Sequence, residues 1–422
     1  MNVSVLGKGV MDLLIRAGRQ DHTVVEQLLT PPTTGLARVG SKPISALVAD
    51  AHVAEERSKL GDIAAHAGCP YLIDPVTPLL QSNVAPANKW ALLPFAHAEA
   101  LDPRDLHDAR VQDELIERVF DFQRSHGATH LIPPYLYLPK RGDEWEALNL
   151  SLLQRSVRYL SAEGIGLPVV PVFAASLAQY GPQATWKDGL DSFLKVAADL
   201  NVDRVALSYS FNDPAKAKYS HIAQLATATE HAASMVEIVS WRQGLYGLDM
   251  LALGASGYET GIETRESLHY VSLASTQKPQ PPKPDKDQGG AASMLYVGQF
   301  GRSLRKQAAL VLLEDPRIRG SLVCTSDGTC CPDGTASMVN KHREHAIRER
   351  AREISELAAI PDAGSWRLNH VAQRAGRAVN LARTANEILE GAGLRDRVPT
   401  DPFEAMHQVT SELLTLRNRR TA

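Results

Sequence analysis

Three of the four cysteines lie in one short segment, and this cluster is the clearest sign of chemistry in the sequence. Cys324, Cys330 and Cys331 fall within eight residues, among glycines, aspartates and a proline that favour a loop. Thiolates bind Zn²⁺ strongly in a reducing compartment, and a tetrahedral structural site needs four ligands. A redox pair or a set of free thiols is the alternative. The fourth zinc ligand would be a downstream histidine: His342, His345 or His370.

Carboxylates form the second group of candidate residues. Asp74 ends an apolar run, and Asp249 and Glu259 lie near a later one. Two carboxylates can share the work of a group transfer, one as nucleophile and the other as general acid and base. Each of them has a structural alternative, because an Asp that ends a strand commonly caps the next helix. Asn212 could hydrogen-bond a substrate, although Asn after a strand is commonly a turn former.

The elements that position these residues are predicted from alternating patterns that begin at about residue 44. Short apolar runs alternate with amphipathic helices such as Val111–Arg124, which is typical of βαβ units with a buried parallel sheet. Seven or eight such units favour a closed (β/α)₈ barrel, and a doubly wound sheet is the alternative. The runs predicted as strands are Ile44–Ala49, Tyr71–Pro75, Trp90–Ala96, Thr129–Leu138, Pro168–Ala174, Val202–Ser210 and Asp249–Ala255.

The chain divides into three predicted parts. Residues 1–274 form the barrel, and residues 275–292 are a Pro-, Lys- and Gly-rich insertion that we expect to be flexible. Residues 293–422 contain a hairpin over Met294–Leu304, the cysteine cluster and a basic helical region.

Charge and composition narrow the classes of partner and location. Basic residues outnumber acidic ones between Met294 and Arg383, although the whole chain carries a net charge of −3. This excess favours a polyanion partner, and a solvated helical surface is the alternative. The candidate phosphate contacts are Arg302, Arg305, Lys306, Arg374 and Arg377.

No apolar run approaches the length of a membrane span, and four cysteines do not make a disulfide scaffold. We therefore expect a cytoplasmic protein without a membrane partner.

Taken in order, these features resemble the tRNA-guanine transglycosylase superfamily, including its branch that places 7-deazaguanines in DNA. Tyr71–Asp74 resembles the family's early strand with an active-site Asp, and Gly247–Met250 resembles its Gly-Ile-Asp-Met motif. Pro168–Val172 and Val205–Ser210 resemble the strands next to the base. His370 sits where the family has its zinc histidine.

This resemblance implies exchange of guanine or a 7-deazaguanine in tRNA or DNA, by a (β/α)₈ barrel with a structural Zn²⁺. It implies Asp74 as acid and base, Asp249 or Glu259 as nucleophile, and Asn212 and Ser208 as base contacts. A homodimer or an accessory partner subunit is also expected. The implied zinc ligands are Cys324, Cys330, Cys331 and His370.

Two other functions remain open. Leu251–Ser256 stands where the family has a nucleophilic Asp followed by Pro-Thr-Arg. The chain is therefore also read as a catalytically degenerate relative that binds nucleic acid or serves as an accessory subunit. The third reading is an unrelated barrel enzyme for a small molecule.

Overall fold

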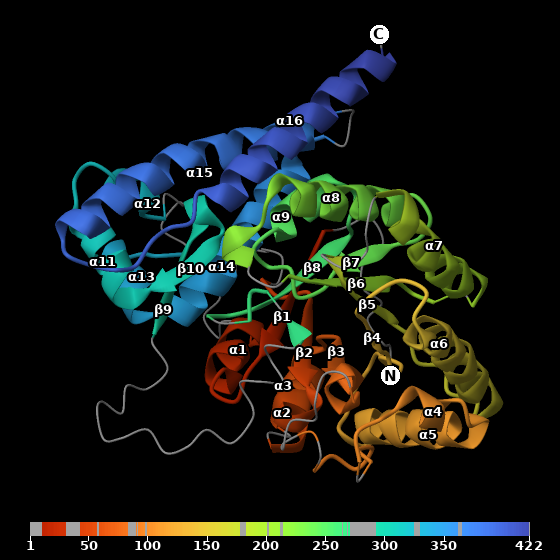
Figure 1. Cartoon of the computed structure of the whole chain (residues 1–422). Helices are drawn as coiled ribbons and strands as arrows, with labels where there is room; N and C mark the ends of the chain where they lie inside the picture. Colours follow the sequence, from red (N-terminus) through yellow and green to blue (C-terminus); the bar gives the residue numbers. More distant parts are fainter. Residues whose placement is uncertain are drawn as a thin grey trace.

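Eight parallel strands form the centre of the molecule (Figure 1). The computed structural model describes residues 11–421, except 31–42, 57–58, 83–89, 91, 98, 178–182, 201, 212–213, 264, 268, 271–292, 325–329 and 362–364. The strand order is β3-β2-β1-β8-β7-β6-β5-β4. The strands are β1 (Asp12–Ala17), β2 (Ala46–Asp50), β3 (Tyr71–Asp74), β4 (Tyr137–Leu138), β5 (Val172–Ser176), β6 (Val205–Ser210), β7 (Ile238–Ser240) and β8 (Gly257–Gly261).

The segment before β4 closes the ring between β3 and β5. Leu72 pairs with His130, and Leu131 pairs with Val169, in isolated parallel bridges. Because β1 also pairs with β8, parallel pairings run from β3 through β1 and β8 to β5, and the two bridges connect β5 back to β3. The predicted (β/α)₈ barrel is therefore confirmed, and the doubly wound alternative is wrong.

Helices cover the outside of the ring, as expected for strands buried on both faces. The helix predicted around Val111–Arg124 begins after Asp108, whose side chain accepts a hydrogen bond from the backbone N–H of Arg110. The barrel helices are α1 (His22–Leu29), α2 (Ala51–Glu56), α3 (Lys59–Ala67), α4 (Pro103–Leu106), α5 (Ala109–Ser125), α6 (Glu144–Ala162), α7 (Gln183–Asp199), α8 (Tyr219–Ala233) and α9 (Gly247–Ala252), with short 3₁₀ turns η1 (Thr77–Leu80) and η3 (Pro214–Lys216).

The strand predictions fail in two ways. The barrel begins at β1 rather than at about residue 44, and β1, β7 and β8 were not predicted. Of the predicted strands, Asp249–Ala255 lies mainly in α9, and the described residues of Trp90–Ala96 form turns. The charged residues Arg16 and Glu259 interrupt the apolar runs of β1 and β8, which hid these strands from a hydrophobicity pattern.

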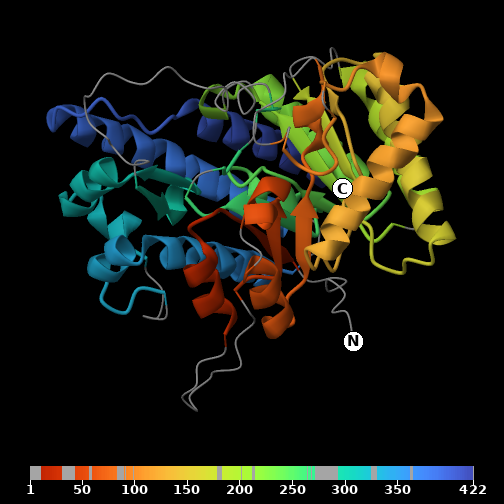
Figure 2. The ribbon, with the colours of Figure 1, turned by 90° about the horizontal axis from the view of Figure 1, so that it is seen from below.

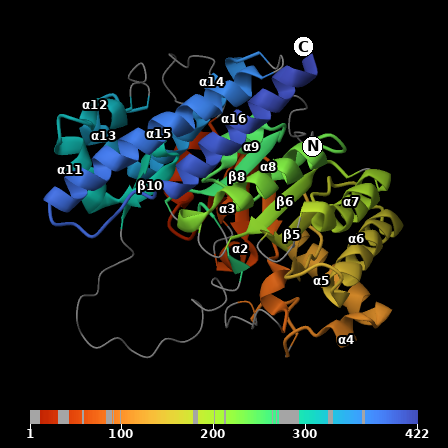
Figure 3. The same ribbon diagram turned by 45° about the horizontal axis from the view of Figure 1, so that its top comes forward.

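The C-terminal region lies along one side of the barrel, opposite α5 and α6 (Figure 2). The predicted hairpin is confirmed: β9 and β10 pair antiparallel around Gly301, which has a φ of 59°. Helices α15 and α16 lie side by side, and α16 packs on α8 (Figure 3). The elements are β9 (Met294–Val297), η4 (Gly298–Phe300), β10 (Arg302–Arg305), α11 (Lys306–Glu314), α12 (Arg319–Leu322), α13 (Thr335–Asn340), α14 (His342–Ala359), α15 (Trp366–Gly391) and α16 (Asp401–Thr421).

Two further predictions concern the insertion at 275–292 and the absence of a membrane span. The predicted insertion at 275–292 lies outside the described residues. Among the helices of the described ranges, none combines the length and the apolar character that a membrane span requires.

A buried histidine at the start of the β4 segment makes the fold sensitive to mild acid. His130 is fully buried, and its Nε2 atom has no hydrogen-bond partner among the described residues. Burial lowers the pKa of His130 to about 4, so the folded state stays unprotonated while an unfolded chain protonates below about pH 6.5.

His130→Gln is therefore expected to flatten the pH dependence of stability. Through His130, the wild type should lose about 2 kcal/mol of unfolding free energy between about pH 7 and pH 5, and almost nothing above pH 7. Urea unfolding of both proteins at the two pH values measures the difference. An equal loss in the variant would contradict this account.

Candidate functional site

Two arginines and three carboxylates meet inside the ring at the carboxyl ends of the strands. Arg16 lies on β1, Asp50 ends β2, Asp74 ends β3, Arg242 follows β7, and Glu259 lies on β8. All five side chains are buried. Barrel enzymes place their active sites at this end of the strands. We call these five residues the ionic cluster.

Arg16 is the centre of the ionic cluster. Its Nε atom donates to Oε1 of Glu259 at 2.7 Å, and its Nη1 atom donates to Oδ1 of Asp50 at 2.5 Å. Its Nη2 atom donates both to Oδ2 of Asp74 at 3.0 Å and to Oε2 of Glu259 at 3.2 Å. Because one nitrogen binds both carboxylates, these two oxygens can lie no further apart than the two bonds laid end to end, about 6 Å.

Arg242 and Arg265 balance the remaining negative charge. Nη2 of Arg242 lies 2.6 Å from Oδ1 of Asp50 and 3.1 Å from Oδ2 of Asp74, and the Arg242 backbone N–H donates to Oε2 of Glu259 at 2.9 Å. Nη1 of Arg265, whose side chain is 35% exposed, lies 2.8 Å from Oδ2 of Asp50. Burial opposes ionisation of Asp50, but Arg242, Arg16 and Arg265 outweigh it and hold the pKa of this carboxyl well below its usual range.

Asp74 receives two further side-chain hydrogen bonds and one from the backbone. The indole Nε1 of Trp241 donates to Oδ2 at 3.2 Å, and the hydroxyl of Tyr135 donates to Oδ1 at 2.9 Å. The backbone N–H of Val76 also donates to Oδ1, at 2.9 Å. Both oxygens are therefore held in a single orientation.

Backbone strain surrounds the same residues. In the described part of the chain, the non-glycine residues with positive φ are Val76 at 45°, Arg242 at 56° and Arg265 at 65°. Each contacts the ionic cluster directly. A left-handed conformation at a non-glycine residue costs on the order of 1 kcal/mol and concentrates at functional sites. The strain therefore marks this end of the barrel independently of its charges.

The structure brings together two of the three predicted catalytic residues. Asp74 and Glu259 share Arg16, whereas Asp249 lies on α9 in a separate pocket beside Phe300 and Arg374. Burial raises the pKa of Asp249 to about 7, although Arg374 acts in the opposite direction.

The predicted base contacts are divided between described and undescribed parts of the chain. Ser208 is buried on β6, and its hydroxyl lies 3.3 Å from that of Tyr270. Asn212 lies outside the described residues.

The sequence patterns did not predict Arg16 and Arg242 as site residues. The signal that could have indicated Arg16 is a charged residue inside the otherwise apolar segment Asp12–Ala17.

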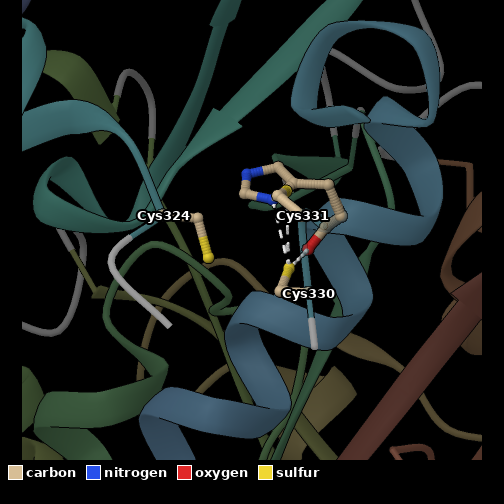
Figure 4. Close-up of side chains that lie close together, drawn as sticks. Cys324, Cys330 and Cys331 are labelled. Carbon is tan, nitrogen blue, oxygen red and sulfur yellow. Dashed lines mark hydrogen bonds between the residues drawn. The ribbon is translucent and has the colours of Figure 1, made fainter. Parts of the chain in front are cut away.

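The three clustered thiols meet one imidazole beside the barrel (Figure 4). The Sγ atoms of Cys324, Cys330 and Cys331 and one ring nitrogen of His345 all lie within 4.8 Å of one another. Nδ1 of His345 is 3.4 Å from Sγ of Cys330 and 3.3 Å from Sγ of Cys331. Three thiolates and one imidazole are a ligand set that structural Zn²⁺ prefers. We call these four residues the Cys₃His centre.

The hydrogen bonding of His345 is typical of a metal-bound histidine. Its Nε2 atom lies 3.0 Å from the carbonyl oxygen of Tyr296 on β9, so Nε2 carries the hydrogen and the Nδ1 lone pair faces the thiols. Such a bond to the second ring nitrogen fixes the tautomer and the ring plane of a metal-bound histidine.

The described residues that could hold a metal do not include His370, the fourth ligand implied by the resemblance. The group that can hold a metal contains His345 of α14, because α14 packs on β9 and carries its imidazole to the thiols. His370 lies on α15, and His342 instead pairs with Glu263, with 2.5 Å between Nε2 and Oε1.

The predicted phosphate contacts lie in different surroundings. Arg302 and Arg305 line a groove with a cavity of about 140 Å³ that also contains Arg397 and Asp396. Arg374 instead points inward, with Nη2 2.5 Å from the Gly298 carbonyl oxygen and 2.7 Å from Oε1 of Glu353. Arg374 is therefore engaged within the protein and does not offer a phosphate contact in this conformation. Lys306 begins α11, and Arg377 is exposed on α15.

No protein-family model matches the chain, and no curated protein matches it. Among solved structures, it is similar to an endo-β-1,4-mannanase from Thermotoga petrophila, with 11% identity, TM-score 0.40, and coverage of 61% of this chain and 69% of that one. It is also similar to a type I 3-dehydroquinate dehydratase from Clostridium difficile, with 9% identity, TM-score 0.36, and coverage of 65% and 95%. A third is a dihydrodipicolinate synthase from Oceanobacillus iheyensis, with 10% identity, TM-score 0.31, and coverage of 96% of both chains. These enzymes differ in their chemistry, and none assigns an activity to this chain.

Proposed function

We propose that this chain is a base-exchange transferase that acts on guanine or a 7-deazaguanine in tRNA or DNA. The observation that carries the proposal is the pair formed by Asp74 and Glu259, which bind one nitrogen of Arg16 at the carboxyl end of the barrel. Exchange at a glycosidic carbon needs one carboxylate to attack and a second to move the proton.

The residues after Glu259 support its assignment as the nucleophile. The segment Glu259-x-x-x-Glu263-Thr264-Arg265 has the spacing of the Asp-x-x-x-Pro-Thr-Arg pattern of the transglycosylases, with Glu in place of both Asp and Pro. Gly247–Met250 forms the first part of α9, and the end of this helix and a turn separate it from Glu259, so the pattern begins further along the chain than the resemblance to Gly-Ile-Asp-Met implied.

In the proposed reaction, the Glu259 carboxylate attacks C1′ of the ribose as the bond from C1′ to the base nitrogen breaks. The bond's electron pair leaves with the base, which takes a proton from Asp74. The incoming base returns a proton to Asp74, and its nitrogen displaces Glu259 from C1′. Arg265 is the most exposed cation that contacts the ionic cluster, so we expect the substrate to enter from its side.

The C-terminal region would hold the nucleic acid and a structural Zn²⁺. Cys324, Cys330, Cys331 and His345 would ligate the ion, which would tie the three cysteines to α14 and supply no step of the reaction. Arg302, Arg305, Lys306 and Arg377 would contact phosphates, which supply most of the affinity of such proteins for nucleic acid. A homodimer or an accessory subunit remains a prediction.

The decisive experiment is incorporation of a labelled base. Purified protein with its zinc is incubated with labelled guanine or 7-deazaguanine and with bulk tRNA or DNA. We expect label in one of the two nucleic acids, with Asp74→Asn and Glu259→Gln as inactive controls. Folded, zinc-containing protein that incorporates no label into either polymer would contradict the proposal.

A second candidate function is a catalytically degenerate relative that only binds nucleic acid. The favouring observation is that Arg16 and Arg242 already occupy Asp74 and Glu259, as they would in a purely structural ion network. Binding of tRNA or DNA without incorporation would support this candidate over the first.

A further inference from the structure

Helix α14 contacts both the Cys₃His centre and the loops that carry the cations of the ionic cluster. His345 faces the thiols, and Arg350 lies five residues later on the same helix. Arg350 is buried, and its guanidinium lies over the Tyr296 ring at 4.0 Å. Tyr296 also accepts the hydrogen bond from His345, so the two residues share one neighbour.

Arg350 joins the segment that follows β7 to the segment that follows β8. Its Nη1 atom donates to the carbonyl oxygen of Gly244 at 3.2 Å, and its Nη2 atom donates to Oε1 of Glu266. The two segments also contact each other, since the backbone N–H of Leu245 donates to the Glu266 carbonyl oxygen at 3.3 Å. Ser303 on β10 adds two bonds of 3.0 Å to the Glu266 carboxylate.

These two segments supply Arg242 and Arg265. Arg242 precedes Gly244 by two residues, and Arg265 immediately precedes Glu266. Both arginines have positive φ, a conformation that persists only where the surrounding structure enforces it. The junction is also tight, because a Cβ atom on Gly244 would lie 2.0 Å from Oγ1 of Thr260. The hydrogen bonds from Arg350 to the Gly244 carbonyl and to Glu266 are thus placed to hold Arg242 and Arg265 in their positive-φ conformations.

The first turn of α14 supports the same loop from its other side. Nε of Arg343 donates to Oε2 of Glu263 at 3.0 Å, and His342 pairs with the other oxygen of this carboxylate. The segment from Glu263 to Glu266 is therefore attached to α14 on both sides of Arg265. A displacement of α14 would move Arg265 and Arg242 together.

We propose that Arg350 is a positioning residue for the ionic cluster, and that the Cys₃His centre acts through α14 and Arg350 to keep Arg242 and Arg265 in place. The predicted effect on catalysis depends on the proposed base exchange. The role of Arg350 in positioning Arg242 and Arg265 does not depend on it. Loss of Arg350 is expected to lower kcat/KM for base exchange by about a hundredfold, the effect of a small misplacement in an active site.

Trp241 reports on the ionic cluster without any substrate. Its Nε1 atom donates to Asp74 at 3.2 Å, and the Arg16 guanidinium lies 5.1 Å from its ring centre. In protein labelled with 5-fluorotryptophan, the ¹⁹F resonance of Trp241 is assigned by Trp241→Phe. Trp145, buried on α6, gives an internal reference for the remainder of the barrel.

The test compares Arg350→Met with a matched variant on the same helix. Arg348→Met removes an arginine two residues away that pairs with Glu344 and is 38% exposed. We expect Arg350→Met to shift the Trp241 resonance and leave that of Trp145 unchanged, with one zinc ion retained per chain. Arg348→Met is expected to shift neither resonance, and Arg350→Lys should restore part of the wild-type position.

Metal removal tests whether the Cys₃His centre is coupled to the ionic cluster through Arg350. Chelation should shift the Trp241 resonance in the wild type and in Arg348→Met, but add little in Arg350→Met, since the connection is already lost. If Arg350→Met leaves Trp241 unmoved, or if chelation moves it equally in all three proteins, the inference is overturned. Should Arg350→Met fail to fold, the double variant Arg350→Met/Glu266→Gln, which leaves no unpaired carboxylate, is measured under the same criteria. Because these readouts need no activity, they hold even if the transferase assay fails.

Discussion

Glu259→Gln and Asp74→Asn are each expected to lower base exchange by about a thousandfold or more. An amide cannot attack C1′ as a carboxylate does, and it cannot donate and regain the proton that the leaving and incoming bases exchange. Both substitutions preserve side-chain size in a buried site. Incorporation of labelled base under single-turnover conditions measures the effect, and a variant that retains a tenth of the wild-type rate would remove its residue from the proposed mechanism.

These substitutions also unbalance a buried set of charges, so stability must be measured beside activity. Glu259→Gln leaves Arg16 with a weaker partner, and breaking one partner of a buried ion pair typically costs about 3–5 kcal/mol. Asp50→Asn is the matched control for this cost, because Asp50 contacts Arg16 and Arg242 but has no part in the proposed chemistry. We expect it to destabilise the protein at least as much as Glu259→Gln while retaining far more activity. Equal losses of activity in the two variants would make the ionic cluster a structural element.

Each chain is expected to bind one zinc ion, and its removal is expected to destabilise the C-terminal region strongly. The three sulfurs and Nδ1 of His345 lie close enough to share one ion, and structural Zn²⁺ contributes on the order of 10 kcal/mol of apparent free energy in small zinc domains. Even if zinc contributes only a part of this free energy in a larger protein, chelation is expected to lower Tm by on the order of 10 °C. Metal analysis and thermal unfolding with and without chelator measure both effects.

Two histidine variants separate the observed ligand from the one that the resemblance implied. His345→Ala is expected to lose the zinc, as is Cys331→Ser, whereas His370→Ala should keep one ion per chain. His370 is a suitable control because it lies in the same region on α15 but outside the group of metal ligands. Zinc retained in His345→Ala, or lost in His370→Ala, would reverse the assignment.

The sequence determined the features that depend on local pattern. Apolar runs such as Val202–Ser210, alternating with amphipathic helices such as Val111–Arg124, specified the barrel because burial on both faces leaves a continuous apolar signature. The hairpin over Met294–Leu304 followed from its glycine turn, and the thiol cluster from three cysteines within a few residues of each other. Each of these signals lies within one short stretch of chain.

The tertiary structure decided the features that depend on contacts between distant residues. Arg16 and Glu259 are 243 positions apart, and each looks like a break in an apolar strand until the other is placed beside it. Likewise, the choice of His345 over His370 depends on which helix packs against β9, and the engagement of Arg374 depends on a glutamate from another helix. Hydrophobic burial leaves a periodic trace in the sequence, whereas ion pairing and metal coordination depend on separations of a few ångströms that only the closed ring and its packed helices establish.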